Sequence, residues 1–115
     1  MSKSQRDKGA RWEREVAHRL EAAMPGSGAI KAIAQTRGGA EAPDVLVPGL
    51  FWVECKVGAR PALMRALEQA ERDCPEARGL TALAIVKQDR QPPVVVMRLQ
   101  DFEEFIGEWW ERAQA

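Results

Sequence analysis

The chain of 115 residues has little of what several classes of protein need. It contains one histidine (His18), two cysteines (Cys55 and Cys74) and no apolar run long enough to cross a bilayer. The cysteines do not form a C-x-x-C pair, so we expect neither a disulfide framework nor a zinc knuckle. Any metal site would have to use mainly oxygen ligands, which favours magnesium or manganese. The polar N-terminus lacks the apolar stretch of a signal peptide, which predicts a cytoplasmic protein with no membrane partner.

Charged residues of both signs are plentiful, and they cancel, because 17 Lys and Arg balance 17 Asp and Glu. They are unevenly distributed along the chain. Residues 1–37 hold eight basic and four acidic side chains, whereas residues 99–115 hold five acidic and one basic. The basic third could face a polyanion while the acidic end faces elsewhere. The alternative is that both are ordinary solvated helix faces.

Length and composition fit a single globular domain over residues 1–115. Apolar periodicity and stop signals predict helices at residues 5–24, 61–73 and 101–113. Strands are predicted at residues 29–36, 44–47, 50–56, 82–86 and 94–99. Asp101 and Glu104 resemble a capping box at the start of the last helix. The order α-β-β-β-α-β-β-α predicts an α/β protein with a mixed central sheet flanked by helices.

The predicted first helix carries a carboxylate on its apolar side. Trp12, Val16 and Leu20 form an apolar stripe, and at about 100° per residue Glu13 falls within it. Burial of an unpaired carboxylate is costly, so Glu13 should have a cation partner or open into a polar cleft. A local salt bridge at the edge of the stripe is the simpler alternative.

A second set of charged side chains lies in the predicted hairpin. Because side chains alternate along a strand, Glu54 and Lys56 point to the same face. A two-residue loop would set Asp44 opposite Val53, whereas a three-residue loop at residues 48–50 would set it opposite Glu54. We predict the longer loop, or an irregular start at Asp44 with the same result. Both carboxylates then lie on one face.

Three carboxylates and a lysine that meet at a cleft suit the hydrolysis of a phosphodiester. Asp44 and Glu54 would hold Mg²⁺ or Mn²⁺, helped by the backbone carbonyl of Cys55. The metal lowers the pKa of a bound water, and Lys56 would orient that water or stabilise the pentacoordinate phosphate. Glu13 would complete the shell of the metal, directly or through a water. The predicted catalytic set is therefore Glu13, Asp44, Glu54 and Lys56.

These residues carry a resemblance to known nucleases. Pro43-Asp44, nine residues and then Glu54-Cys55-Lys56 resemble the PD-(D/E)xK nuclease signature, and the α-β-β-β-α-β setting resembles the restriction-endonuclease-like core. Residues 8–15, with the sequence KGARWERE, resemble the K-G-x-x-x-E-R opening of archaeal-type Holliday junction resolvases. A Gly38-Gly39 turn and the strand end at residues 85–87 also fit that family.

The resemblance implies a homodimeric, magnesium-dependent endodeoxyribonuclease of DNA recombination and repair, which cleaves four-way (Holliday) junctions in branched double-stranded DNA. By position, the catalytic roles of the family fall on the four residues of the predicted set. Gln69 matches a glutamine found after the lysine in related nucleases, where it is a supporting contact, and a plain surface glutamine is the alternative. Two other functions stay open: another structure- or repair-specific nuclease of the same fold, and a non-catalytic DNA-binding module.

Basic residues and glycines near the predicted site are candidate DNA contacts, because phosphates are bound by Lys, by Arg and by closely approaching backbone. Ordinary surface charge is the alternative for each basic residue. Gly9 would let the backbone of the first helix come close to a phosphate. The other candidates are Lys3, Arg6, Lys8, Arg11, Arg37, Gly38 and Gly39.

The predicted last helix carries an aromatic stripe. Packing against the sheet would account for Phe102, Phe105 and Ile106. The adjacent Trp109 and Trp110 are more than a small core needs, and aromatic residues favour interfaces. We therefore expect a two-fold homodimer, which would suit a junction with two strands to be cut.

Overall fold

The computed structural model describes residues 2–31, 42–76 and 79–115. The order of helices and strands agrees with the order predicted from the sequence. The elements are α1 (Lys3–Ala23), β1 (Ile30–Lys31), β2 (Val45–Val47), β3 (Phe51–Gly58), α2 (Leu63–Asp73), β4 (Thr81–Gln88), β5 (Val94–Val96) and α3 (Leu99–Gln114). Of the strand predicted at 29–36, only β1 falls within the described residues, and the predicted glycine turn at residues 38–39 lies outside them.

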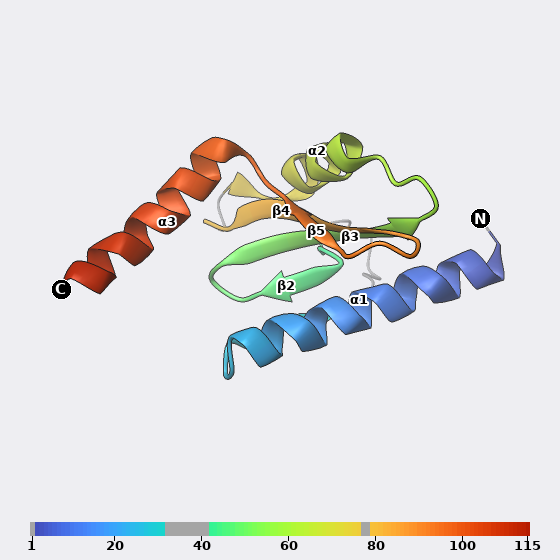
Figure 1. Ribbon diagram of the computed structural model, residues 1–115, viewed down its shortest axis with the longest axis horizontal. Helices are drawn as coiled ribbons and strands as arrows, with labels where there is room; N and C mark the ends of the chain where they lie inside the picture. Colours follow the sequence, from blue (N-terminus) through green and yellow to red (C-terminus); the bar gives the residue numbers. More distant parts are fainter. Residues whose placement is uncertain (1, 32–41, 77–78) are drawn as a thin grey trace.

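The five strands form one mixed sheet in the order β1-β2-β3-β4-β5. Every neighbouring pair is antiparallel except β3 and β4, which run parallel. Parallel neighbours need a crossover connection, and α2 supplies it. Helices α1 and α2 lie on opposite faces of the sheet (Figure 1). The prediction of an α/β fold with a mixed sheet flanked by helices is therefore confirmed.

The hairpin between β2 and β3 has the predicted longer loop. Val47 pairs with Phe51 and Val45 pairs with Val53, so residues 48–50 form a three-residue loop. Gly49 has a φ of 73°, a conformation that glycine adopts without steric cost. Asp44 precedes the first paired residue of β2, and continuation of the register places it opposite Glu54.

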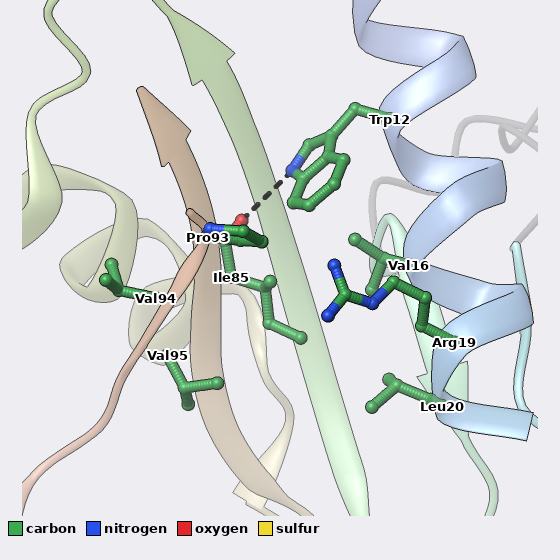
Figure 2. A pocket seen from close by; sticks show the side chains of 8 residues that line it. All are labelled: Trp12, Val16, Arg19, Leu20, Ile85, Pro93, Val94 and Val95. Carbon is green, nitrogen blue, oxygen red and sulfur yellow. Dashed lines mark hydrogen bonds between the residues drawn. The ribbon is translucent and has the colours of Figure 1, made fainter. Parts of the chain in front are cut away.

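Helix α1 buries the predicted stripe against the sheet. Trp12, Val16 and Ala17 pack in one cluster with Val53 and Cys55 of β3 and with Leu83 and Ile85 of β4. The Trp12 indole N–H donates a hydrogen bond of 3.3 Å to the backbone carbonyl of Ile85 (Figure 2). The indole therefore both fills the core and satisfies its polar atom, which fixes α1 against the centre of the sheet.

The opposite face of the sheet packs against α2 through small side chains. Ala66 of α2 is fully buried against Ala84 and Val86 of β4. Residues 83–86 are all buried, as expected for a central strand covered on both faces. The predicted buried strand at residues 82–86 is therefore confirmed, and β4 extends beyond it at both ends.

Helices α1 and α3 start earlier than predicted, and different contacts lie at the two starts. Ser2 and Gln5 form a capping box that begins α1 at Lys3. Arg98 is the N-cap of α3 and makes no capping bond through its side chain. Its guanidinium instead donates to both carboxylate oxygens of Glu71 at 2.7 and 2.9 Å, which fixes the chain direction before the helix. The predicted capping box of Asp101 and Glu104 is therefore wrong.

Helix α3 is not covered by the sheet, although the ring of Phe105 lies 5.6 Å from that of Phe51 of β3. It has no buried residue, and it projects away from the body of the molecule (Figure 1). Phe102, Phe105 and Ile106 are 45, 41 and 42% exposed, so the prediction that the sheet covers them is wrong. The physical reason is that β5 is the edge strand and the chain leaves the sheet there. Within the described part of the chain, no helix is both long and apolar enough to cross a membrane.

Candidate active site

A cleft of about 800 Å³ gathers most of the residues predicted to act together. Its walls come from the N-terminal half of α1, the start of the hairpin, the second half of β3 and one residue of α2. The predicted residues that line it are Arg6, Lys8, Gly9, Glu13, Asp44, Glu54, Cys55, Lys56 and Gln69. Residues from four separate elements therefore meet around one opening.

The cleft opens where β3 extends beyond its pairing with β2. The pairing between β2 and β3 ends at Val45 and Val53, whereas β3 continues to Gly58 beside β4. Among the described strands, none pairs with residues 54–58 on the β2 side. Residues 54–58 of β3 line the cleft along this edge, and Asp44 lies at its start.

Asp44 and Glu54 form a close pair of carboxyl groups. Asp44 Oδ2 accepts a hydrogen bond of 2.9 Å from the backbone N–H of Cys55. Glu54 is only 6% exposed, and the pKa of its carboxyl is raised to about 8. Burial is the largest cause, followed by the charge of Asp44 and a hydrogen bond between the two carboxyl groups. Without a cation, the pair therefore tends to retain a proton near neutral pH.

Lys56 lies on the same face of β3 as Glu54. Its Nζ is 3.9 Å from Glu54 Oε2, and its positive charge opposes the rise in the pKa of that carboxyl. The lysine side chain is 43% exposed, so its ammonium group can also reach a ligand in the cleft. The predicted alternation of side chains is confirmed, because Cys55 between them packs in the core with α1.

The thiol of Cys55 is not a candidate nucleophile. Burial raises its pKa, and the charges of Asp44, Glu13 and Glu54 raise it further. A neutral buried thiol is chemically inert in this setting. The backbone of Cys55 is different, because in an extended residue the N–H and the C=O point to the same edge of the strand. Since the N–H bonds Asp44, the carbonyl also faces the open edge of β3.

Glu13 reaches the cleft from α1. It is half-buried, and its charge acts on Cys55 of the hairpin, so it lies near the carboxyl pair. No group of three or more His, Cys, Asp or Glu side chains within the described residues is arranged to hold a metal ion. The carboxyl pair and the Cys55 carbonyl are therefore the oxygen donors gathered at the edge of β3, with Glu13 across the cleft from α1.

The predicted DNA contacts divide into two groups. Arg6 and Lys8 line the cleft, and Lys8 Nζ lies 2.6 Å from Asp89 Oδ1. Lys3 does not line the cleft and forms an exposed ion pair of 3.2 Å with Asp7. Arg11 is exposed and also lies outside the lining. Arg37, Gly38 and Gly39 lie outside the described residues.

The sequence analysis missed Asp89, which lines the cleft beside Lys8. Its backbone N–H donates a hydrogen bond of 2.8 Å to the carbonyl of Gly58 at the end of β3. Because β3 and β4 are parallel, the residues that follow both strands come together at one edge. An acidic residue three positions after the predicted central strand was the available signal, and β4 extends to Gln88, directly before Asp89.

A second, smaller pocket lies between α1 and β5 and has a volume of about 150 Å³. Its lining is apolar apart from Arg19, and it contains no carboxylate (Figure 2). It has no group that could transfer a proton to a substrate or hold a cation. The larger cleft is therefore the candidate active site.

Comparison of the chain with protein-family models, with curated proteins and with solved structures gives no match. The features of this chain that bear on its function are therefore the cleft itself and the resemblance of its residues to the nuclease signature.

Proposed function

We propose that the protein is a magnesium-dependent endodeoxyribonuclease with a restriction-endonuclease-like αβββαβ core, and that it cleaves four-way DNA junctions by hydrolysis. The observation that carries the proposal is the buried carboxyl pair of Asp44 and Glu54 at the open edge of β3, with Lys56 3.9 Å from Glu54. The order of α1, three strands, α2 and β4 supports the proposed core. We place the enzyme in the cytoplasm, in DNA recombination and repair.

The donors at the edge of β3 suit a hard divalent cation. Two carboxylates and one backbone carbonyl are oxygen ligands of the kind that Mg²⁺ and Mn²⁺ prefer. The raised pKa of Glu54 shows that two negative charges are costly there without a cation. In the proposal, Asp44, Glu54 and the Cys55 carbonyl hold the ion, and Glu13 contributes through a water. The bound ion would supply a water of lowered pKa and neutralise charge on the phosphate.

Lys56 would act on the reacting phosphate. Its side chain is 43% exposed and its Nζ lies 3.9 Å from Glu54 Oε2, so an ammonium group with three donors lies beside the carboxyl pair and can also reach a ligand in the cleft. A cation placed where negative charge develops stabilises the transition state of phosphoryl transfer. Gln69, which lines the cleft from α2, would be a supporting hydrogen-bonding contact.

Arg6 and Lys8 would bind the phosphates of the DNA that flank the cleavage site. Both lie on the N-terminal half of α1 and both line the cleft. Lys8 is paired with Asp89, so DNA binding would have to compete with that ion pair or extend it. The resemblance to resolvases supplies two parts of the proposal, which are the four-way junction as substrate and the homodimer.

The first experiment is a cleavage assay on a synthetic four-way junction and on linear duplex of the same sequence, with Mg²⁺, Mn²⁺ or a chelator. We expect metal-dependent cutting of the junction in preference to the duplex. Glu54→Gln, which keeps the shape of the side chain, should reduce the cleavage rate by at least roughly 100-fold. DNA binding, measured by gel shift with Ca²⁺, should be retained.

Glu13→Gln and Glu15→Gln make a matched pair on one helix. Glu13 lines the cleft, whereas Glu15 is exposed and lies outside its lining. Only the first substitution should slow cleavage.

The cleavage assay also separates the alternative functions. Equal cutting of junction and duplex would favour another nuclease of this fold over a resolvase. Absence of cleavage with either metal, with DNA binding present, would favour a DNA-binding module over an enzyme.

A further inference from the structure

The exposed apolar surface of this protein is concentrated at its C-terminal end. Among the described residues, eleven large hydrophobic side chains are exposed, and eight of them belong to residues 94–110. Trp109 and Trp110 are the most exposed aromatic residues, at 61 and 60%. Scattered apolar residues are normal on a surface, but a continuous face of this kind marks an interaction site.

The size of this face approaches that of one side of a stable interface. Leu99 and the five residues of the aromatic stripe, each exposed by 41% or more, present roughly 600–650 Å² if a large side chain is taken as about 200 Å². A standard interface buries about 800 Å² on each partner. Flanking polar side chains would supply the remainder.

Contacts at its base hold α3 in a defined direction. Arg98, the N-cap, is bound by Glu71 of α2, and the ring of Phe105 lies 5.6 Å from that of Phe51. The helix then extends past the sheet, at the end of the molecule opposite the N-terminus of α1 (Figure 1). A partner could therefore cover α3 without blocking the cleft, which α1 lines from its N-terminal half.

The charges beside the aromatic stripe point to a particular partner. Asp101 lies in the first turn of α3 and Arg112 in the last turn. At about 100° per residue, their positions differ by about 20° around the helix axis, so both lie along the same flank of the stripe. One flank thus carries Asp101 at one end and Arg112 at the other, with Glu108 also on it, one turn before Arg112. Such a flank is complementary to its own copy when two helices run antiparallel.

We propose that a second copy of this chain covers α3, with the two α3 helices packed antiparallel about a two-fold axis. Asp101 of each copy then faces Arg112 of the other, and the stripe from Phe102 to Trp110 packs against itself. A two-fold interface requires this self-complementarity, because the same patch serves both subunits. The inference rests on the homodimer of the proposed function and specifies the surface that forms it.

The test measures association without DNA, by sedimentation of the full chain over about 1–200 μM, a range suited to an interface of this size. Wild type should be a dimer. Trp109→Ser should weaken association at least roughly 30-fold, because a central aromatic residue is a typical hot spot. Circular dichroism of the variant should show that the fold is intact, since Trp109 is 61% exposed and its ring contact is with Trp110 of the same helix.

Charge reversals identify the partner as a second copy. Asp101→Arg and Arg112→Asp each bring like charges together and should each weaken self-association about tenfold. An equimolar mixture of the two variants restores both opposite-charge pairs and should associate as wild type does. Glu111→Arg, on the opposite side of the helix, makes the same change in charge as Asp101→Arg and should have little effect.

Two outcomes would overturn the proposal. A monomeric wild type at the highest concentration would exclude a self-interface, and the face would then belong to another partner. A mixture that associates no better than either variant alone would exclude the antiparallel arrangement. Neither result depends on catalysis, so a failure here is distinct from a failure of the cleavage assay.

Discussion

Helices α1 and α3 carry similar apolar stripes with opposite outcomes. The stripe of α1 is buried against β3 and β4, with Trp12 only 4% exposed. The stripe of α3 has two tryptophans and buries none of its residues. The two stripes also differ in charge, because Glu13 lies within the first and no charged residue lies within the second. A stripe therefore predicts that a helix has a partner, but not whether the partner is in the same chain.

The sharpest way to test this comparison is to remove a tryptophan from each helix. Trp12→Ala should lower the free energy of unfolding by about 3–5 kcal/mol, because it leaves a cavity in the core and removes the bond to Ile85. Trp109→Ala should change the stability of the monomer by less than about 1 kcal/mol. Urea unfolding at low protein concentration measures both. Equal losses would mean that α3 is buried within its own chain.

The charged residues of the two regions should differ in their effect on the pH dependence of stability. The pKa of Glu54 is raised from its ordinary value of 4.5 to about 8 in the metal-free protein. Between these pH values the folded state keeps a proton that the unfolded state releases, so folding stability falls as the pH rises through the window. We expect Glu54 to contribute roughly 1–3 kcal/mol to this loss, allowing for solvent in the cleft.

Glu54→Gln cannot ionise, so this variant should lack that part of the loss and become more stable than wild type toward pH 8. Glu104→Gln, on the exposed surface of α3, should leave the pH profile unchanged. Thermal or urea unfolding from pH 5 to 8 without metal gives the comparison. Parallel profiles for wild type and Glu54→Gln would show that the Glu54 carboxyl is already ionised throughout this range.

Much of the fold was predictable because local patterns specify it. The stripe of α1 identified the buried face of that helix, and the run at residues 82–86 identified the central strand. The predicted three-residue loop set the register of the hairpin, and in that register Val45 and Val47 are buried. That same register brought Asp44 opposite Glu54, which is why the carboxyl pair could be proposed from sequence.

Other features depend on contacts between distant residues, and the sequence pattern did not specify them. The start of α3 depends on the Arg98–Glu71 bond between two helices, so the Asp101–Glu104 pattern led to the wrong boundary. The pairing of Lys8 with Asp89 joins residues 81 positions apart. Glu13 lines the cleft from α1, so its approach to the carboxyl pair depends on how α1 packs against β3 and β4, which helical periodicity does not specify.

The smallest expected effect comes from substitution of the single glycine of α1 or the single glycine of α3. A Cβ added at Gly9 of α1 or at Gly107 of α3 would meet no atom within 4 Å. Alanine in place of a helical glycine should therefore stabilise the folded state by about 0.5–1 kcal/mol at either position. At Gly107 the gain should appear chiefly as greater helicity by circular dichroism, because α3 is largely independent of the core.

DNA affinity should separate the two glycines. Gly9 lines the cleft, where the proposal needs the helix backbone to come close to a phosphate. A methyl group there would keep the phosphate at a distance, so Gly9→Ala should weaken junction binding several-fold while raising stability. Gly107→Ala should leave junction binding unchanged, because α3 lies at the other end of the molecule (Figure 1). If both variants bind the junction as wild type does, the N-terminal half of α1 contacts DNA through side chains alone, and Arg6 and Lys8 would then account for its part in binding.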